Sequence, residues 1–160
     1  MFVIRPIRPD DKERLALALS RLSRETIRRR FLAAKPRLSA SELRYLTEVD
    51  GVRHIALVAV LEDDPETIVA VARCVRFADA PDTAEMAIVV GDAYQGRGLG
   101  RALAVALADA ARAVGVERFA ATMLADNRAA QRLMRTIARR LEERPAPGGL
   151  REVSIDLKAA

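Results

Sequence analysis

The sequence is poor in cysteine and in aromatic residues. It contains one cysteine, one histidine and no tryptophan, with only two tyrosines and four phenylalanines. A single cysteine, Cys74, cannot form an internal disulfide, so we place the chain in the reducing cytoplasm. With so few rings the chain lacks the platforms on which single-strand binders stack bases, and we expect no nucleic-acid partner.

Long apolar runs are also missing. No stretch approaches the roughly 20 apolar residues that a membrane helix needs, and the start, MFVIRPIRPDD, has arginines where a signal peptide would be apolar. We therefore expect no membrane partner. A chain of 160 residues that is 51% apolar and 31% charged is typical of one globular domain, which we expect to span residues 1–160.

Positive charge is in excess. The formal charge is +5, which favours anionic partners such as cofactor phosphates or an acidic protein surface. Basic residues gather in SRLSRETIRRRFLAAKPR (20–37), where Glu25 is the only acid. This stretch is either a landing surface for an acidic partner or a solvated helix face, and charge runs are more often the latter.

The first third of the chain is expected to be mostly helical. After a short strand over 2–5, apolar spacing predicts a helix from about 10 to 22 and another over 26–31. Ser39 and Glu42 fit a capping box that opens a third helix, ending at Gly51.

The remainder alternates between strand and helix patterns. Three Val- and Ile-rich stretches, over 54–62, 67–77 and 84–90, predict antiparallel strands joined by turns. Further on we expect a helix over 99–115, a strand over 116–124, a helix from Asn127 through Leu141 with Asp126 as its N-cap, a turn over 144–150 and a last strand over 151–157. The fold class is therefore α/β, with a mixed, mostly antiparallel sheet and helices on both faces.

The sequence QGRGLG, residues 95–100, lies between an apolar strand and a helix. Such a turn forms a phosphate cradle, because backbone N–H groups and the helix dipole point at the ligand. It lacks the Gly-Lys-Ser/Thr of a P-loop, and its G-x-G-x-G spacing differs from the dinucleotide pattern G-x-G-x-x-G. A tight strand–helix turn without a ligand is the alternative interpretation.

The same residues match the pattern [QR]-x-x-G-x-[GA], and ADNRAAQRLM (125–134) is similar to N-x-x-A-x-x-L at Asn127, Ala130 and Leu133. On these motifs the chain resembles GNAT-superfamily N-acetyltransferases, and more closely the Pat-like protein lysine acetyltransferases. The resemblance implies a GNAT fold and acetyl-CoA as co-substrate, with no metal. It implies that the preceding strand binds the pantetheine arm and that the turn and the next helix bind the pyrophosphate. The cofactor-binding positions are Ile88, Val89, Val90, Gln95, Gly96, Arg97, Gly98, Leu99, Gly100, Arg101 and Asn127.

Glu85 is the candidate general base. It is the only acid in TAEMAIVV, the strand that leads to the acyl end of the co-substrate, and we expect partial desolvation to raise the pKa of its carboxyl. A glutamate at the matching place acts as base in the Pat-like enzymes. The alternatives are a solvated strand end or an arginine partner. Many relatives carry a tyrosine at the position of Met134, which cannot protonate the leaving thiolate.

Four other residues are given structural interpretations. We expect His54 to form hydrogen bonds at a strand end, Cys74 to lie in the core and Tyr94 to pack beneath the glycine turn; Tyr45 is an outside candidate for the acceptor pocket.

The function inferred is an enzyme that moves acetyl from acetyl-CoA to a primary amine, first of all a protein lysine. A small-molecule amine acetyltransferase and a non-catalytic acyl-CoA-binding module are the alternatives. A homodimer is compatible with the sequence.

Overall fold

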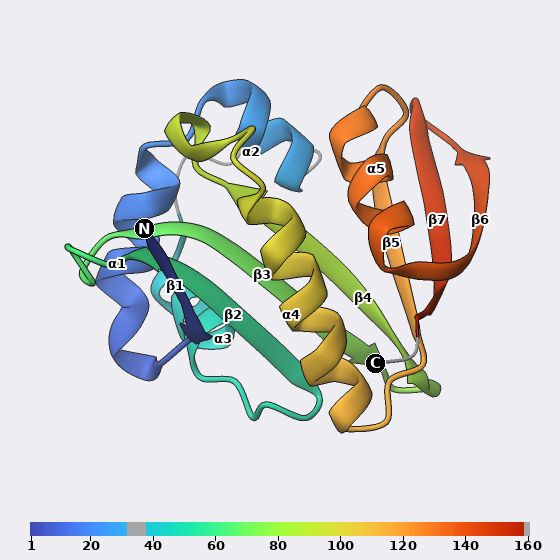
Figure 1. Ribbon diagram of the computed structural model, residues 1–160, viewed down its shortest axis with the longest axis horizontal. Coiled ribbons are helices and arrows are strands. Elements are labelled where there is room, and N and C mark those ends of the chain that lie inside the picture. Colours follow the sequence, from blue (N-terminus) through green and yellow to red (C-terminus); the bar gives the residue numbers. More distant parts are fainter. Residues whose placement is uncertain (32–37, 159–160) are drawn as a thin grey trace.

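The computed structural model describes residues 1–31 and 38–158, which form one seven-stranded sheet in the order β1-β2-β3-β4-β5-β7-β6 (Figure 1). Every neighbouring pair is antiparallel except β4 and β5, which are parallel. The strands are β1 (Phe2–Pro6), β2 (His54–Leu61), β3 (Ile68–Phe77), β4 (Ala80–Val90), β5 (Arg118–Leu124), β6 (Ala138–Ala146) and β7 (Leu150–Leu157). The predicted mixed, mostly antiparallel sheet is confirmed.

Five α-helices and two short 3-10 turns are described. They are η1 (Pro9–Asp11), α1 (Lys12–Ser20), α2 (Arg24–Phe31), α3 (Ala40–Thr47), η2 (Asp92–Tyr94), α4 (Leu99–Ala113) and α5 (Arg128–Ile137). The predicted capping box of α3 is present, with Ser39 Oγ accepting from the Glu42 N–H at 3.2 Å. This helix ends at Thr47, before the predicted Gly51. The end of the basic stretch, residues 32–37, lies outside the described residues.

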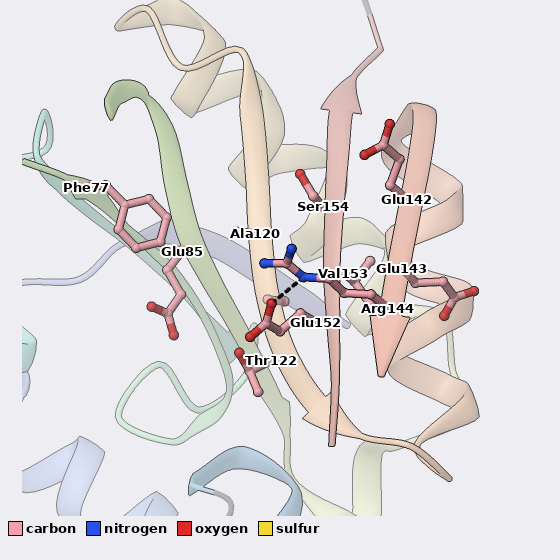
Figure 2. A pocket seen from close by; sticks show the side chains of 11 residues that line it. Phe77, Glu85, Ala120, Thr122, Glu142, Glu143, Arg144, Glu152, Val153 and Ser154 are labelled. Atoms are coloured by element: carbon pink, nitrogen blue, oxygen red, sulfur yellow. Dashed lines mark hydrogen bonds and ion pairs between the residues drawn. The ribbon is translucent and has the colours of Figure 1, made fainter. Parts of the chain in front are cut away.

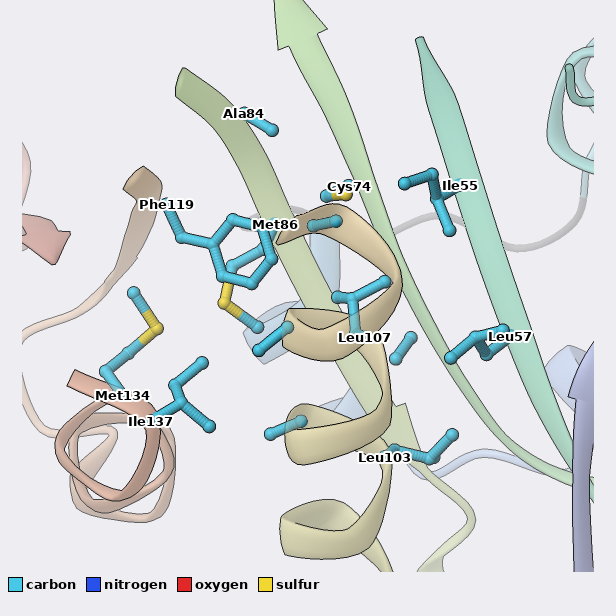
Figure 3. Packing of buried hydrophobic residues seen from close by; sticks show 14 of the residues in the cluster. Ile55, Leu57, Cys74, Ala84, Met86, Leu103, Leu107, Phe119, Met134 and Ile137 are labelled. Carbon is cyan, nitrogen blue, oxygen red and sulfur yellow. The ribbon is translucent and has the colours of Figure 1, made fainter. Parts of the chain in front are cut away.

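The main core lies between the sheet and the helices α4 and α5 (Figure 3). The apolar stripe of α4 fits against β2 and β3, with Leu103 and Leu107 wholly buried. Phe119 of β5 is wholly buried in the same cluster, between α4 and α5. Burial of a large apolar side chain contributes about 1.5–3 kcal/mol, so this layer fixes the helices that flank the glycine turn.

The opposite face of the sheet is covered unevenly. Helices α1 and α3 pack against β2 and β3, where Val58 is 0% exposed. On β5, β7 and β6 the corresponding side chains are solvent-accessible, and Thr122, Ser154 and Glu142 are exposed. This face of the C-terminal half of the sheet is therefore open.

The last third of the chain differs from the expected pattern. The helix α5 ends at Ile137, and Leu141, expected on its face, lies in the strand β6, which was missed. The N-cap of α5 is Asn127 rather than Asp126, because the Asn127 side chain accepts from the Ala130 N–H at 3.2 Å. The strand β6 runs to Ala146, into the segment that had been interpreted as a turn.

The two parallel strands of the sheet separate soon after they meet. Pairing between β4 and β5 covers Thr83–Glu85 opposite Arg118–Ala120, and β4 continues to Val90 without further pairing to β5. Figure 1 shows the two ribbons close together near the C-terminal end of the chain and diverging away from it. The end of β4 that precedes the glycine turn is therefore open on its β5 side.

Candidate functional site

A cleft of about 460 Å³ lies where β4 and β5 diverge. Ten of the eleven positions assigned to the co-substrate line it: Ile88, Val89, Val90, Gln95, Gly96, Gly98, Leu99, Gly100, Arg101 and Asn127. They come from β4, the glycine turn, the first turn of α4 and the N-cap of α5. The fold thus brings together residues that are far apart in the sequence.

The glycine turn exposes its backbone to this cleft. Gly96 and Gly98 have φ angles of 76° and 80°, a left-handed conformation that costs other residues roughly 1–2 kcal/mol. A Cβ atom at either position would have no atom within 4 Å, so the space beside the backbone is open. Gly98 is also the N-cap of α4, whose positive dipole end faces the cleft. The turn has the geometry of an anion cradle.

Gln95 connects the turn to the helix α2. Its Nε2 donates to the Val90 carbonyl at 3.0 Å and to Thr26 Oγ1 at 3.3 Å. Asp92 strengthens the same connection, since its carboxylate accepts from Thr26 Oγ1 at 2.7 Å and from Ser23 Oγ at 2.8 Å. Helix α2 is thereby held against the cleft.

Arg97 is the one assigned position outside the cleft lining. It is exposed, and its guanidinium lies 5.7 Å from the ring centre of Tyr94. Tyr94 packs as expected, with its ring 6.0 Å from that of Phe2 in an edge-on contact. The cation nearest the glycine turn inside the cleft is Arg101.

A small pocket of about 80 Å³ continues from the cleft between β4 and β5. The two share Arg30, Ile88 and Asn127 among their lining residues. Met134 borders the small pocket and is only 2% exposed, so it packs in the core. On its far side the pocket shares Ala121 and Thr122 with a third cavity.

The third cavity is an open groove of about 600 Å³ on the uncovered face of the sheet (Figure 2). Glu85 lies on its β4 side, and glutamates from β6 and β7 line the rest. These glutamates are paired with arginines: Glu142 with Arg140 at 3.2 Å, Glu143 with Arg135 at 3.5 Å and Arg151 at 3.6 Å, and Glu152 with Arg144 at 2.7 Å. Figure 2 shows Arg144 reaching Glu152.

Glu85 differs from the other glutamates of the groove and from what the sequence predicted for it. Within the described ranges it forms no ion pair. The carboxylate is exposed rather than desolvated, and the residue opposite it on β5, Ala120, is small. The expected desolvation of Glu85 is therefore wrong. Arg30 lies close enough to Glu85 for the Glu85 carboxylate to raise the pKa of Arg30, although burial, the larger effect, leaves it lowered.

Arg73, in the middle of β3, is a buried cation beside this region. It is 6% exposed, and its Nη1 donates to the Leu46 carbonyl and to His54 Nε2, both at 2.9 Å. Burial and the charge of Arg73 lower the pKa of His54 to about 4, so the imidazole is neutral and accepts this bond. The expected hydrogen-bonding role of His54 is confirmed.

Two remaining interpretations concern Cys74 and Tyr45. Cys74 is 1% exposed, and burial raises the pKa of its thiol to about 12, which confirms it as an unreactive core residue. Tyr45 is 57% exposed, and its ring centre lies 4.9 Å from that of His54.

The sequence analysis missed the contribution of α2. Thr26, Arg29 and Arg30 line the cleft, and both arginines also line the small pocket. Arg29 and Arg30 follow Thr26 by three and four residues, which places the three side chains on one side of the helix. The sequence contains this signal. The position of that face against β4 depends on the Asp92 and Gln95 contacts, which have no local signature. The sequence analysis also missed Arg132 of α5, which lines the cleft.

Residues 1–31 and 38–158 hold neither a candidate metal-binding cluster nor a candidate membrane-spanning helix. They contain no group of three or more His, Cys, Asp or Glu placed to hold a metal ion. No helix among them is both long and apolar enough to cross a membrane.

Comparison with known proteins places the cleft in context. The family model described as "Acetyltransferase (GNAT) family" matches residues 22–137. The acetyltransferase Pat of Mycolicibacterium smegmatis is 41% identical over 102 residues, which are 64% of this chain and 30% of that protein. The matched segment thus covers less than a third of this relative's length.

Solved structures share the fold. The GNAT domain of S. lividans PAT superposes with a TM-score of 0.85 and 33% identity, covering 96% of this chain and 89% of that one. A putative acetyltransferase of Salmonella typhimurium, described with its cofactor acetyl-CoA, superposes with a TM-score of 0.74 at 19% identity, covering 99% and 95% of the two chains. At that identity the second likeness shows the fold alone.

Proposed function

The chain belongs to the acetyltransferase (GNAT) family, and from this premise we propose that it transfers an acetyl group from acetyl-CoA to a primary amine. We propose a protein lysine as the acceptor and Glu85 as the general base. Residues 1–160 would form a single catalytic domain, in keeping with the one continuous sheet of the described residues.

The adjacency of the three cavities carries this proposal. The cleft at the glycine turn shares lining residues with the small pocket, and the small pocket shares Ala121 and Thr122 with the groove that contains Glu85. A co-substrate bound by its phosphates at the turn would extend along Ile88–Val90 toward Glu85, which stands where the pairing of β4 and β5 ends. An acceptor amine would approach through the groove from the opposite side.

The residues of the cleft suit coenzyme A. Open backbone at Gly96 and Gly98, together with the N-terminus of α4, provides N–H groups for a pyrophosphate. Arg101 and Arg132 add positive charge from two helices. The unpaired edge of β4 beyond Glu85 offers backbone groups to the amide-containing pantetheine arm.

The chemistry requires a base and a polarised carbonyl. A lysine ammonium has a pKa near 10.4, so its proton must be removed before the nitrogen can attack the thioester. Glu85 would accept this proton, through water where the distance requires it. An N–H group of the strand over Ile88–Val90 would stabilise the oxyanion. Met134 cannot donate a proton, so the departing thiolate would take one from water or from the incoming ammonium.

We expect Glu85→Gln to lower kcat by about 100-fold or more, because general base catalysis typically contributes that much. The KM for acetyl-CoA should change little, since Glu85 lies outside the cleft lining. The measurement is release of free thiol from acetyl-CoA with acceptor proteins and amines. Glu117→Gln is the matched control, because Glu117 is exposed and lies outside the three cavities.

Two results would contradict parts of this proposal. Equal rates for the wild type and Glu85→Gln would remove Glu85 as the base. Binding of acetyl-CoA without thiol release for any acceptor would favour an acyl-CoA-binding module in place of an enzyme.

A small cationic amine is a second candidate acceptor, because four glutamates line the groove. Three of them are already paired with arginines, which reduces the net attraction for a free cation. The exposed arginines of α2, such as Arg24 and Arg28, instead favour an acidic protein surface at the rim of the site. Comparing a polyamine with an unfolded lysine-containing protein in the thiol assay decides between the two.

A further inference from the structure

Two arginines beside the proposed reaction site form no ion pair with a carboxylate of the described residues. Arg30, in the last turn of α2, lines both the cleft and the small pocket. Arg73 lies behind it on β3, next to Ala87 of β4, which also borders the small pocket. The two lie close enough for the charge of Arg30, after burial, to contribute to lowering the pKa of Arg73 to about 10. Both guanidiniums therefore remain charged at neutral pH.

The neighbouring residues do not neutralise this pair. In the described part of the chain neither Arg30 nor Arg73 forms an ion pair, and the partners of Arg73 are a carbonyl and the neutral His54. The sequence that follows α2, LAAKPR (32–37), contains no acid and two further cations. Glu85 acts on Arg30 only at a distance and remains exposed.

Buried charge without a counter-charge is costly, because the desolvation of the ion is not repaid by an attraction. Guanidinium groups present planar, forked N–H donors that match the two oxygens of a carboxylate. Only one Nη atom of Arg73 is used by its two bonds within the chain. An anionic group in the small pocket would face Arg30 directly and would also act on Arg73, which is close enough to feel the charge of Arg30.

We propose that Arg30 and Arg73 form a subsite for a carboxylate carried by one of the two reactants, next to the reacting carbonyl. The carboxylate would belong either to the acyl group of a dicarboxylic acyl-CoA or to the acceptor, close to its amine. This inference rests on the proposed function and narrows the class of substrate it uses.

Two pairs of reactants distinguish the sources. In the acyl arm, succinyl-CoA is compared with butyryl-CoA, which has the same number of acyl carbons and no carboxylate. In the acceptor arm, acetyl-CoA is used with a lysine peptide that has Asp beside the lysine, and with the same peptide carrying Asn. In one of the two arms, the kcat/KM of the carboxylate-bearing reactant should exceed that of its uncharged counterpart by about tenfold or more, as expected for one charge-assisted pair.

Variants at α2 test the assignment. Arg30→Gln should reduce the preference to about one, because the ratio of the two reactants cancels any change in rate that both share. Arg28→Gln, on an exposed part of the same helix, should keep the preference. A wild-type preference near one in both arms, or a preference that survives Arg30→Gln, would overturn the subsite.

A binding measurement separates this failure from failure of the proposed function. The melting temperature is recorded with each reactant of both pairs, and the carboxylate-bearing one should stabilise the wild type more than Arg30→Gln. Stabilisation by acetyl-CoA with no carboxylate preference rejects the subsite alone. If acetyl-CoA does not stabilise the protein and no thiol is released, the proposed function is rejected. The subsite is then tested by whether the Asp peptide raises the melting temperature more than the Asn peptide does.

Discussion

Asp11 shows how a single buried carboxylate holds the start of the chain. Its side chain is 0% exposed and accepts from Arg5 Nη1 and Nη2, both at 2.8 Å, and from the Arg8 N–H at 2.7 Å. Burial alone would raise the pKa of Asp11, but these hydrogen bonds and the charges of Arg5 and Arg14 leave it lowered. The pair ties β1 to the helix α1.

We expect Asp11→Asn to lower the free energy of unfolding by about 3–5 kcal/mol, because it leaves the guanidinium of Arg5 without its buried partner. Denaturant unfolding monitored by circular dichroism measures this change. Asp10→Asn is the control: the Asp10 side chain is 69% exposed, and its ion pair with Arg8 should contribute less than about 1 kcal/mol. Equal effects of the two variants would contradict the buried pair.

At the scale of elements, the position of α2 decides the shape of the cleft. Ser23 Oγ accepts from the Thr26 N–H at 3.2 Å at the start of the helix and donates to Asp92, which also bonds Thr26. Asp92 follows β4, so one carboxylate connects the end of that strand with the first turn of α2. The arginines of α2 that line the cleft depend on this connection.

Asp92→Ala should destabilise the protein by about 1–2 kcal/mol through lost hydrogen bonds to a charged acceptor. More specifically, we expect the KM for acetyl-CoA to rise by about tenfold with a smaller change in kcat, since the helix that flanks the cleft is released while Glu85 is untouched.

The measurements for this variant are steady-state kinetics and amide hydrogen exchange of residues 24–31. Faster exchange confined to α2 would support the connection, and unchanged exchange would argue against it. Asp63→Ala, in the exposed turn between β2 and β3, is the matched control.

The elements differ in how clearly their sequences predict them. Runs rich in Val and Ile predicted the strands β2, β3 and β4, and helical periodicity predicted α4, because the apolar side chains of these elements are buried as each pattern requires. The strand β6 was missed because ARRLEERPA has almost no apolar alternation; it is an edge strand that pairs only with β7, and its charges discourage pairing with other chains.

The sequence located the cleft but not its surroundings. Local motifs identified the glycine turn and Asn127, because the residues that form a turn or cap a helix are close together in the sequence. The exposure of Glu85 and the approach of Arg30 depend on which elements cover which face, and no local pattern encodes that. The Asp126 and Asn127 assignments differed by one residue because both side chains are good N-caps.

At the scale of the whole molecule, we expect stability to depend on pH through His54. The folded state keeps this imidazole neutral with a pKa of about 4, whereas the unfolded chain binds a proton below about pH 6.5. Stability is therefore full above pH 6.5, falls as the pH drops toward 4 and levels off below it. The loss from this residue is about 3 kcal/mol.

The carboxylates contribute to stability down to a lower pH than His54 does. Asp11 and Asp92 have lowered pKa values, so their contribution is lost only as the pH falls below about 4. Urea unfolding at about pH 7 and about pH 4.5 therefore isolates the histidine. His54→Gln should flatten the dependence in that range, and a dependence that persists in His54→Gln would contradict the assignment.

The brief contact between β4 and β5 has a consequence for how the molecule is assembled. The pairs β2–β3 and β3–β4 precede it in the chain and β6–β7 follows it, and each joins two strands that are consecutive in the sequence and linked by a short turn. Such local pairings form early, and a short parallel contact between distant segments forms late. We therefore expect the cleft to be among the last features to appear during folding, so acetyl-CoA would act on the final step and slow its reversal.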